Sequence, residues 1–126
     1  MSAPMKSLVR VASGQGFWGD WLEAPRRQVE GGPVDYLMLD YLAEVTMSIL
    51  QKQKERDPKM GYARDFIGAI ESVLPGIVER GVKVIANAGG VNPRACADAL
   101  LALADRKGVR GKLALGVVTG DDLLPR

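Results

Sequence analysis

The chain has 126 residues, 47% of them hydrophobic and 25% charged, which is typical of one globular domain and excludes a disordered or fibrous chain. The net charge of +2, carried by scattered basic residues, predicts no nucleic-acid partner. No apolar run approaches the ~20 residues that cross a bilayer, and the N-terminal residues lack the apolar stretch of a secretory signal. We therefore expect a cytoplasmic protein that binds no membrane.

The chain contains no histidine and a single cysteine. Within this chain, the missing histidine excludes Ser-His-Asp and Cys-His catalysis and zinc sites with histidine ligands. Acid–base chemistry would therefore depend on Asp, Glu, Lys, Tyr or Cys96. A site built from carboxylates alone would favour Mg²⁺ or Ca²⁺ over zinc, but we predict no metal site, and the sequence indicates no particular cofactor.

Apolar runs and helical periodicity alternate along the chain. A glycine-rich loop, residues 14–20, follows the first apolar run. Pro25 suits the first turn of a short helix that Gly31 ends, and Gly81 and Asn92 are suited to cap later helices. Strands are predicted at about residues 8–12, 34–40, 82–86 and 113–118, and longer helices at about residues 42–56, 66–80 (with a kink or new segment at Pro75) and 93–107.

This order predicts an α/β fold: a three-layer α/β/α, Rossmann-like domain with a mostly parallel sheet and helices on both faces. The consecutive apolar residues of Tyr36-Leu-Met-Leu are typical of a strand covered on both faces. No helix follows the fourth predicted strand to cover its edge. We therefore expect residues 1–126 to form a single, incomplete domain, the N-terminal part of a longer one.

Each predicted strand opens into Gly, Asp or Asn at the same end, so we expect a ligand site at that edge of the sheet. Gly14, Gly16 and Gly19 match G-x-G-x-x-G, and Asp40 follows where a dinucleotide fold places its ribose acid. Against dinucleotide binding, Phe17 and Trp18 are bulky, Asp20 is negative, and no helix begins inside the loop.

The later loops allow two interpretations each. The amides of Gly89, Gly90 and Asn92, with Arg94, could hold an anion, or Asn87–Arg94 is a tight turn with Asn92 as helix cap. Asp121 and Asp122 could bind a cation or share a proton, or be solvated or capping residues.

Cys96 lies on a mostly apolar helical stripe, which favours a buried packing role over a reactive thiol. Phe17, Trp18 and Trp21 are more typical of core or subunit-contact residues, but three aromatic residues beside a glycine loop could also form the wall of an apolar pocket.

Five loop motifs, taken in order, resemble the N-terminal part of the acyclic terpene utilisation protein A family. They are the Gly14–Asp20 loop, Asp35–Thr46, Arg56–Tyr62, Asn87–Arg94 and Gly120–Asp122. The resemblance implies bacterial catabolism of acyclic terpenoid or branched acids through coenzyme A thioesters. The loop positions that it carries over are Gly14, Gly16, Gly19, Asp20, Glu44, Asn87, Asn92, Asp121 and Asp122.

If the protein is an enzyme, we expect hydratase or lyase chemistry, with Asp20, Glu44 or Asp122 as acid or base. Amides near Gly14–Gly16 and Gly89–Gly90 would polarise a carbonyl of a small, acyl-CoA-like ligand. The alternatives are a nucleotide-binding module and a non-catalytic subunit, self-associating or completing its sheet with another chain.

Overall fold

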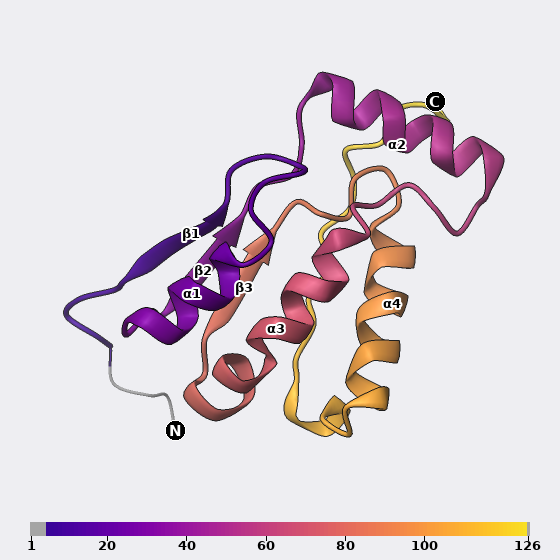
Figure 1. Cartoon of the computed structure of the whole chain (residues 1–126). Coiled ribbons are helices and arrows are strands. Elements are labelled where there is room, and N and C mark those ends of the chain that lie inside the picture. Colours follow the sequence, from indigo (N-terminus) through magenta and orange to yellow (C-terminus); the bar gives the residue numbers. More distant parts are fainter. Residues whose placement is uncertain (1–4, 126) are drawn as a thin grey trace.

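The structure is a computed structural model that describes residues 5–125 (Figure 1). Up to residue 106, strands and helices follow one another in the predicted order, and the α/β fold with a parallel sheet is confirmed. The elements are β1 (Val11–Gln15), α1 (Ala24–Gly31), β2 (Tyr36–Leu39), α2 (Glu44–Arg56), α3 (Asp65–Arg80), β3 (Lys83–Ala86), α4 (Pro93–Arg106) and the 3-10 helix η1 (Arg110–Lys112).

The sheet has three strands in the order β1-β2-β3, all parallel, in the described part of the chain. Val11, Tyr36 and Lys83 form one cross-strand row. β1 lies later than predicted, because Gly14 and Gln15 belong to the strand and not to the loop after it. The register shifts between Ser13 and Gln15, and a Cβ on Gly14 would lie only 2.8 Å from Leu39, so a glycine is required there.

Helices cover one face of this sheet in residues 5–125. α1 and α3 pack against each other and against the face that carries Leu37 and Leu39, both of which are buried (Figure 1). On the opposite face Val11, Met38 and Ile85 are exposed by 62%, 39% and 49%. The third layer expected from the sequence is therefore not formed by the described residues. Strands added in one direction by right-handed crossovers place every connecting helix on the same face.

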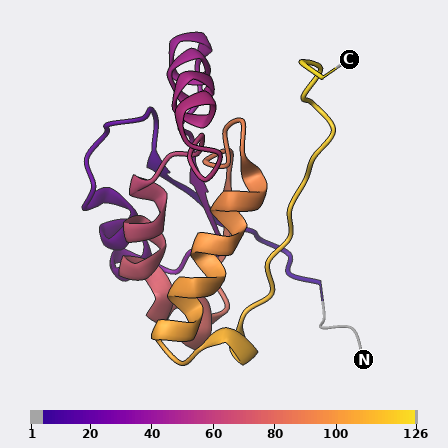
Figure 2. The ribbon, with the colours of Figure 1, turned by 90° about the vertical axis from the view of Figure 1, so that its right-hand side faces the viewer.

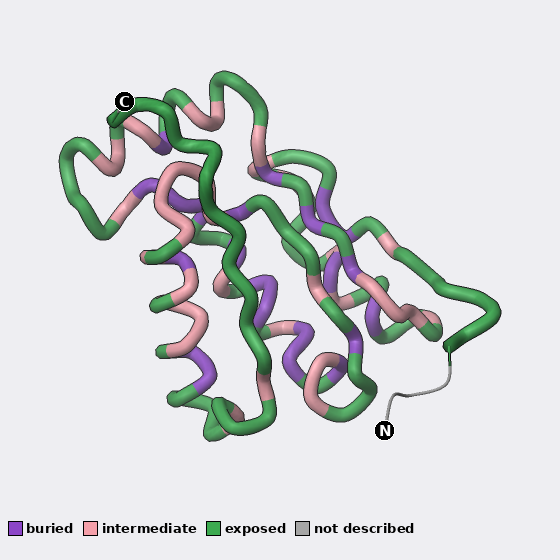
Figure 3. The backbone as a smooth tube through the Cα atoms, turned by 180° about the vertical axis from the view of Figure 1, so that it is seen from behind, coloured by how far each residue is buried: buried purple, intermediate pink, exposed green. Residues whose placement is uncertain are grey.

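The predicted fourth strand is wrong for this structure. Residues 113–118 are extended but belong to no strand, and all of them except Leu113 are exposed. Figures 2 and 3 show this segment as a tail running up one side of the molecule, outside the sheet. The segment makes no ladder hydrogen bonds with β3, although it follows α4 and η1 as a fourth strand would.

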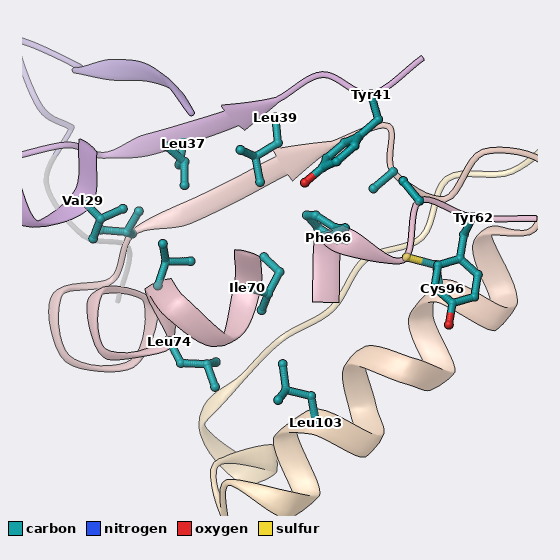
Figure 4. Packing of buried hydrophobic residues seen from close by; sticks show 14 residues of the cluster. Val29, Leu37, Leu39, Tyr41, Tyr62, Phe66, Ile70, Leu74, Cys96 and Leu103 are labelled. Carbon is teal, nitrogen blue, oxygen red and sulfur yellow. The ribbon is translucent and has the colours of Figure 1, made fainter. Parts of the chain in front are cut away.

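The core lies between the covered face of the sheet and α1, α3 and α4. Leu37, Leu39, Ile70 and Leu74 meet there, and Tyr41 packs edge-on against Phe66 with ring centroids 5.8 Å apart (Figure 4); Val29, Tyr62, Cys96 and Leu103 also belong to this cluster.

Local signals explain most of the helix boundaries. Gly81 ends α3 with a φ of 69°, and Asn92 caps α4, as predicted. Of the two outcomes predicted at Pro75, a new helical segment is wrong, because α3 is one continuous helix with Pro75 inside it. α2 stands away from the core, with Val45 and Ile49 exposed (Figures 1 and 2). Among the described residues, no helix has the length and apolar character to span a bilayer.

Candidate functional site

Three loops meet at the carboxyl end of the sheet, which we call the rim. They are residues 16–20 after β1, residues 40–43 after β2 and residues 87–92 after β3 (Figure 1). Parallel pairing places these ends at one edge, where open α/β sheets bind ligands. Three of the four loops that were predicted to share one edge of the sheet therefore do so.

Hydrogen bonds of the Asn87 side chain join the end of β3 to the end of β2. Its side-chain oxygen accepts a hydrogen bond from the N–H of Tyr41 at 2.8 Å, and its amide donates to Asp40, also at 2.8 Å. The N–H of Asp40 donates in turn to the carbonyl of Gln15, at 3.0 Å. The bond from Asn87, followed by one from the N–H of Leu42, lowers the pKa of Asp40 below its ordinary value. The rim thus carries a carboxylate that is ionised at neutral pH and held in one orientation.

Asp20 closes the glycine loop instead of facing a ligand. Its carboxylate accepts hydrogen bonds from the N–H of Gly16 at 2.9 Å and of Trp21 at 2.7 Å. α1 begins only at Ala24, so the loop does not lead directly into a helix. The carboxylate of Asp20 accepts the hydrogen bond of the Gly16 N–H, which a bound pyrophosphate would need. This geometry therefore disfavours dinucleotide binding.

We expect the carboxyl group of Asp20 to titrate below the ordinary aspartate value. The hydrogen bonds from Gly16 and Trp21 favour the charged form and lower its pKa. Because the folded-state pKa is depressed, its stabilising contribution is complete above the pKa in the unfolded chain and is lost as the pH falls through the folded-state pKa. In an NMR titration the amide signals of Gly16 and Trp21 will follow this low midpoint.

In Asp20→Asn the acid-dependent shift of those two amide signals should disappear. A midpoint at or above the ordinary aspartate value would contradict the hydrogen-bonded loop.

The turn after β3 is built by its own hydrogen bonds. The N–H groups of Gly90, Val91 and Asn92 donate to carbonyls of Asn87, Gly61 and Gly89. The side chain of Asn92 accepts from the N–H of Ala95 at 3.3 Å and donates to the carbonyls of Pro58 and Met60. The anion interpretation needed free amides, and most of them are already engaged. The tight turn with a helix cap is the interpretation that the geometry favours, and Arg94 is exposed beside it.

The remaining predicted acids are spread apart. Glu44 is the first residue of α2, shortly after Asp40, and its exposed carboxylate has no hydrogen-bond or ion-pair partner among the described residues. Asp121 and Asp122 lie on the exposed tail, where Asp122 accepts a hydrogen bond from the N–H of Leu124 at 3.0 Å. Figure 2 shows this tail separated from α2. In residues 5–125 no three acidic or cysteine side chains gather in a way that could hold a metal ion.

Two buried polar groups near the rim were not predicted. Gln15 and Tyr41 are only 2% and 1% exposed, and the side-chain oxygen of Gln15 and the hydroxyl of Tyr41 have no partner among the described residues. Burial, more than the nearby Asp65, raises the pKa of Tyr41. The available sequence signal for Gln15 was a polar residue at the end of an apolar strand, whereas Tyr41 lies beyond the end of β2 and had no such signal.

Cys96 is buried, and burial raises the pKa of its thiol to about 11. The predicted packing role is confirmed. Phe17 and Trp21 are 60% and 56% exposed, so they are not core residues, and their role as subunit contacts stays a prediction. Trp18 is partly buried.

A polar cavity of about 750 Å³ opens beside the glycine loop, between α2, α3 and α4. Its wall includes an aromatic ring from the loop, Trp18, and two arginines, Arg64 and Arg106, with Asp65 adding one negative charge. This cavity combines the positive charges of two arginines with an aromatic side chain, groups that can contact phosphate and a flat ring.

A family model described as "Acyclic terpene utilisation family protein AtuA" matches residues 9–126 of the chain. No curated protein and no solved structure matches the chain. The match covers the three loops of the rim and the exposed tail.

Proposed function

Because the chain belongs to the acyclic terpene utilisation (AtuA) family, we propose that it acts in the bacterial breakdown of acyclic terpenoids, on a branched acyl group carried as a coenzyme A thioester. The family match over residues 9–126 is the observation that carries this proposal. The position of the rim, with a polar cavity beside it, supports it.

The cavity fits the coenzyme A part of such a ligand. Arg64 and Arg106 lie on its wall and offer guanidinium groups to phosphate oxygens. Trp18, on the same wall, offers a ring face for the adenine. The thioester would then extend from the cavity toward the rim.

Glu44 is the acid that we assign to proton transfer. Asp20 is held by two amides of its own loop, and Asp122 lies on the tail, whereas the carboxylate of Glu44 is free to meet a ligand beside the Asp40–Asn87 pair. For hydration of an unsaturated acyl thioester, Glu44 would take a proton from water as the oxygen bonds to Cβ. A proton is then returned to Cα, and the net reaction adds one water across the double bond.

The test is turnover of a branched C10 enoyl-CoA by the chain and by Glu44→Gln. Loss of a positioned acid–base group should lower kcat by about 10²-fold or more, whereas calorimetric binding of the same thioester should persist. Glu55→Gln is the matched control, because Glu55 is an exposed glutamate near the other end of α2. Full activity of Glu44→Gln would overturn this role, and binding of NAD without binding of the thioester would overturn the proposed substrate.

A second candidate function is that of a non-catalytic subunit. The exposed apolar side chains of Val11, Met38 and Ile85 favour it, because parallel sheets are ordinarily covered on both faces. A Tm that rises with protein concentration would distinguish self-association through this face from the enzyme.

A further inference from the structure

The outer edge of β3 is an unpaired strand edge. The N–H of Lys83 donates to the carbonyl of Asp35 at 3.0 Å, on the β2 side. Successive backbone groups of a strand point to opposite sides, so the N–H groups of Val84 and Ala86 point away from β2. No strand pairs with this side of β3 in residues 5–125. The edge therefore offers donors and acceptors that match another strand.

An apolar groove of about 510 Å³ runs beside this edge. β3 forms one wall, α3 and α4 form its base, and the segment that starts at Lys112 forms the other wall. Its lining includes Ile70, Leu74, Val84, Ile85, Leu100 and Leu103. A hydrocarbon ligand would cover these side chains but leave the edge of β3 without hydrogen-bond partners, whereas a strand supplies both kinds of contact.

Residues 113–118, Leu-Ala-Leu-Gly-Val-Val, already lie along the far side of this groove. Leu113, Ala114 and Leu115 line it, and the segment runs in the direction of β3 (Figure 1). Leu113 also packs against the core, and Leu115 and Val117 are less exposed than Val118 (43% and 37% against 93%). In an extended strand Leu113, Leu115 and Val117 would share one face, because successive side chains point to opposite faces. The connection through α4 has the form of a crossover between neighbouring parallel strands.

We propose that residues 113–118 dock on the free edge of β3 as a movable fourth parallel strand and close the groove. Leu113, Leu115 and Val117 then face α3 and α4, and the undocked tail of Figure 2 is the open state of the segment. Docking carries Asp121 and Asp122 to the carboxyl edge of the sheet, beside Asn87, and so completes the rim. This inference goes beyond the proposed function and does not depend on its substrate.

The experiment is amide hydrogen exchange, followed by NMR, on the whole chain and on the double variant Leu115→Pro/Gly116→Pro. Two neighbouring prolines are used because only alternate amides of the segment face β3, and proline removes the donor. We expect the amides of Val84 and Ala86 to exchange about tenfold faster in the variant, while Ile85, whose amide faces β2, is unchanged. The control Leu123→Pro/Leu124→Pro, outside the segment, should exchange like the unmodified chain.

Equal exchange of Val84 and Ala86 in the unmodified chain and in the Leu115→Pro/Gly116→Pro variant would overturn the proposal. Slow exchange that survives the prolines and strengthens with protein concentration would also overturn it, because a second copy would then occupy the edge.

Discussion

Replacing Gly90 by alanine should lower the free energy of unfolding by about 3 kcal/mol or more, through backbone strain and overpacking together. Gly90 has a φ of 55°, in the left-handed region that favours glycine. A Cβ there would lie 2.5 Å from a methyl group of Leu50 and 2.7 Å from the carbonyl oxygen of Gly61. The methyl group can move, but the carbonyl cannot, because it accepts the hydrogen bond from the N–H of Val91.

Urea unfolding measures this effect as a shift in midpoint at constant slope. Gly111→Ala is the matched control, since nothing lies within 4 Å of a Cβ at that position, and its change should stay within about 0.5 kcal/mol. Equal stability of the Gly90 and Gly111 variants would mean that the turn after β3 is looser than described, and would reopen the anion interpretation of its amides.

Leu37→Ala should destabilise the fold by about 3 kcal/mol, whereas Met38→Ala should cost less than about 1 kcal/mol. The two residues are neighbours on β2 and point to opposite faces of the sheet. Leu37 is fully buried against the helices, and its removal leaves a cavity in the core. Met38 is 39% exposed on the open face and has fewer contacts to lose.

Both costs are obtained from the same urea titrations as above, with the difference between the two variants as the quantity of interest. Similar costs for Leu37→Ala and Met38→Ala would show that the second face is covered in solution, as the three-layer prediction requires. A much smaller cost at Met38 would confirm that helices cover one face only.

The rim is organised by contacts between loops that are far apart in the chain. The side chain of Asn87 forms hydrogen bonds with Asp40 and Tyr41 after β2. The carboxylate of Asp20 accepts a hydrogen bond from the N–H of Gly16. Of the three acids predicted to be catalytic, this leaves Glu44 as the carboxylate without an internal partner among the described residues. A site at the rim therefore depends on ligand groups reaching Glu44 and the cavity beside Trp18.

The sequence by itself determined the order of the elements from β1 to α4, the parallel α/β class, the caps at Gly81 and Asn92 and the buried state of Cys96. These features depend on short-range signals: apolar periodicity, glycine at positive φ and a capping side chain next to the helix that it caps.

Only the tertiary structure decided which face is covered, whether residues 113–118 pair with β3 and which loop amides remain free. The consecutive apolar residues of Tyr36-Leu-Met-Leu fit a strand covered on one face or on both, so composition could not distinguish two layers from three. The pairing of Asn87 with Tyr41 joins residues 46 positions apart in the chain. Such pairs depend on which residues the fold brings together. A buried backbone N–H, such as that of Tyr41, donates to whichever acceptor the packing places within hydrogen-bond distance.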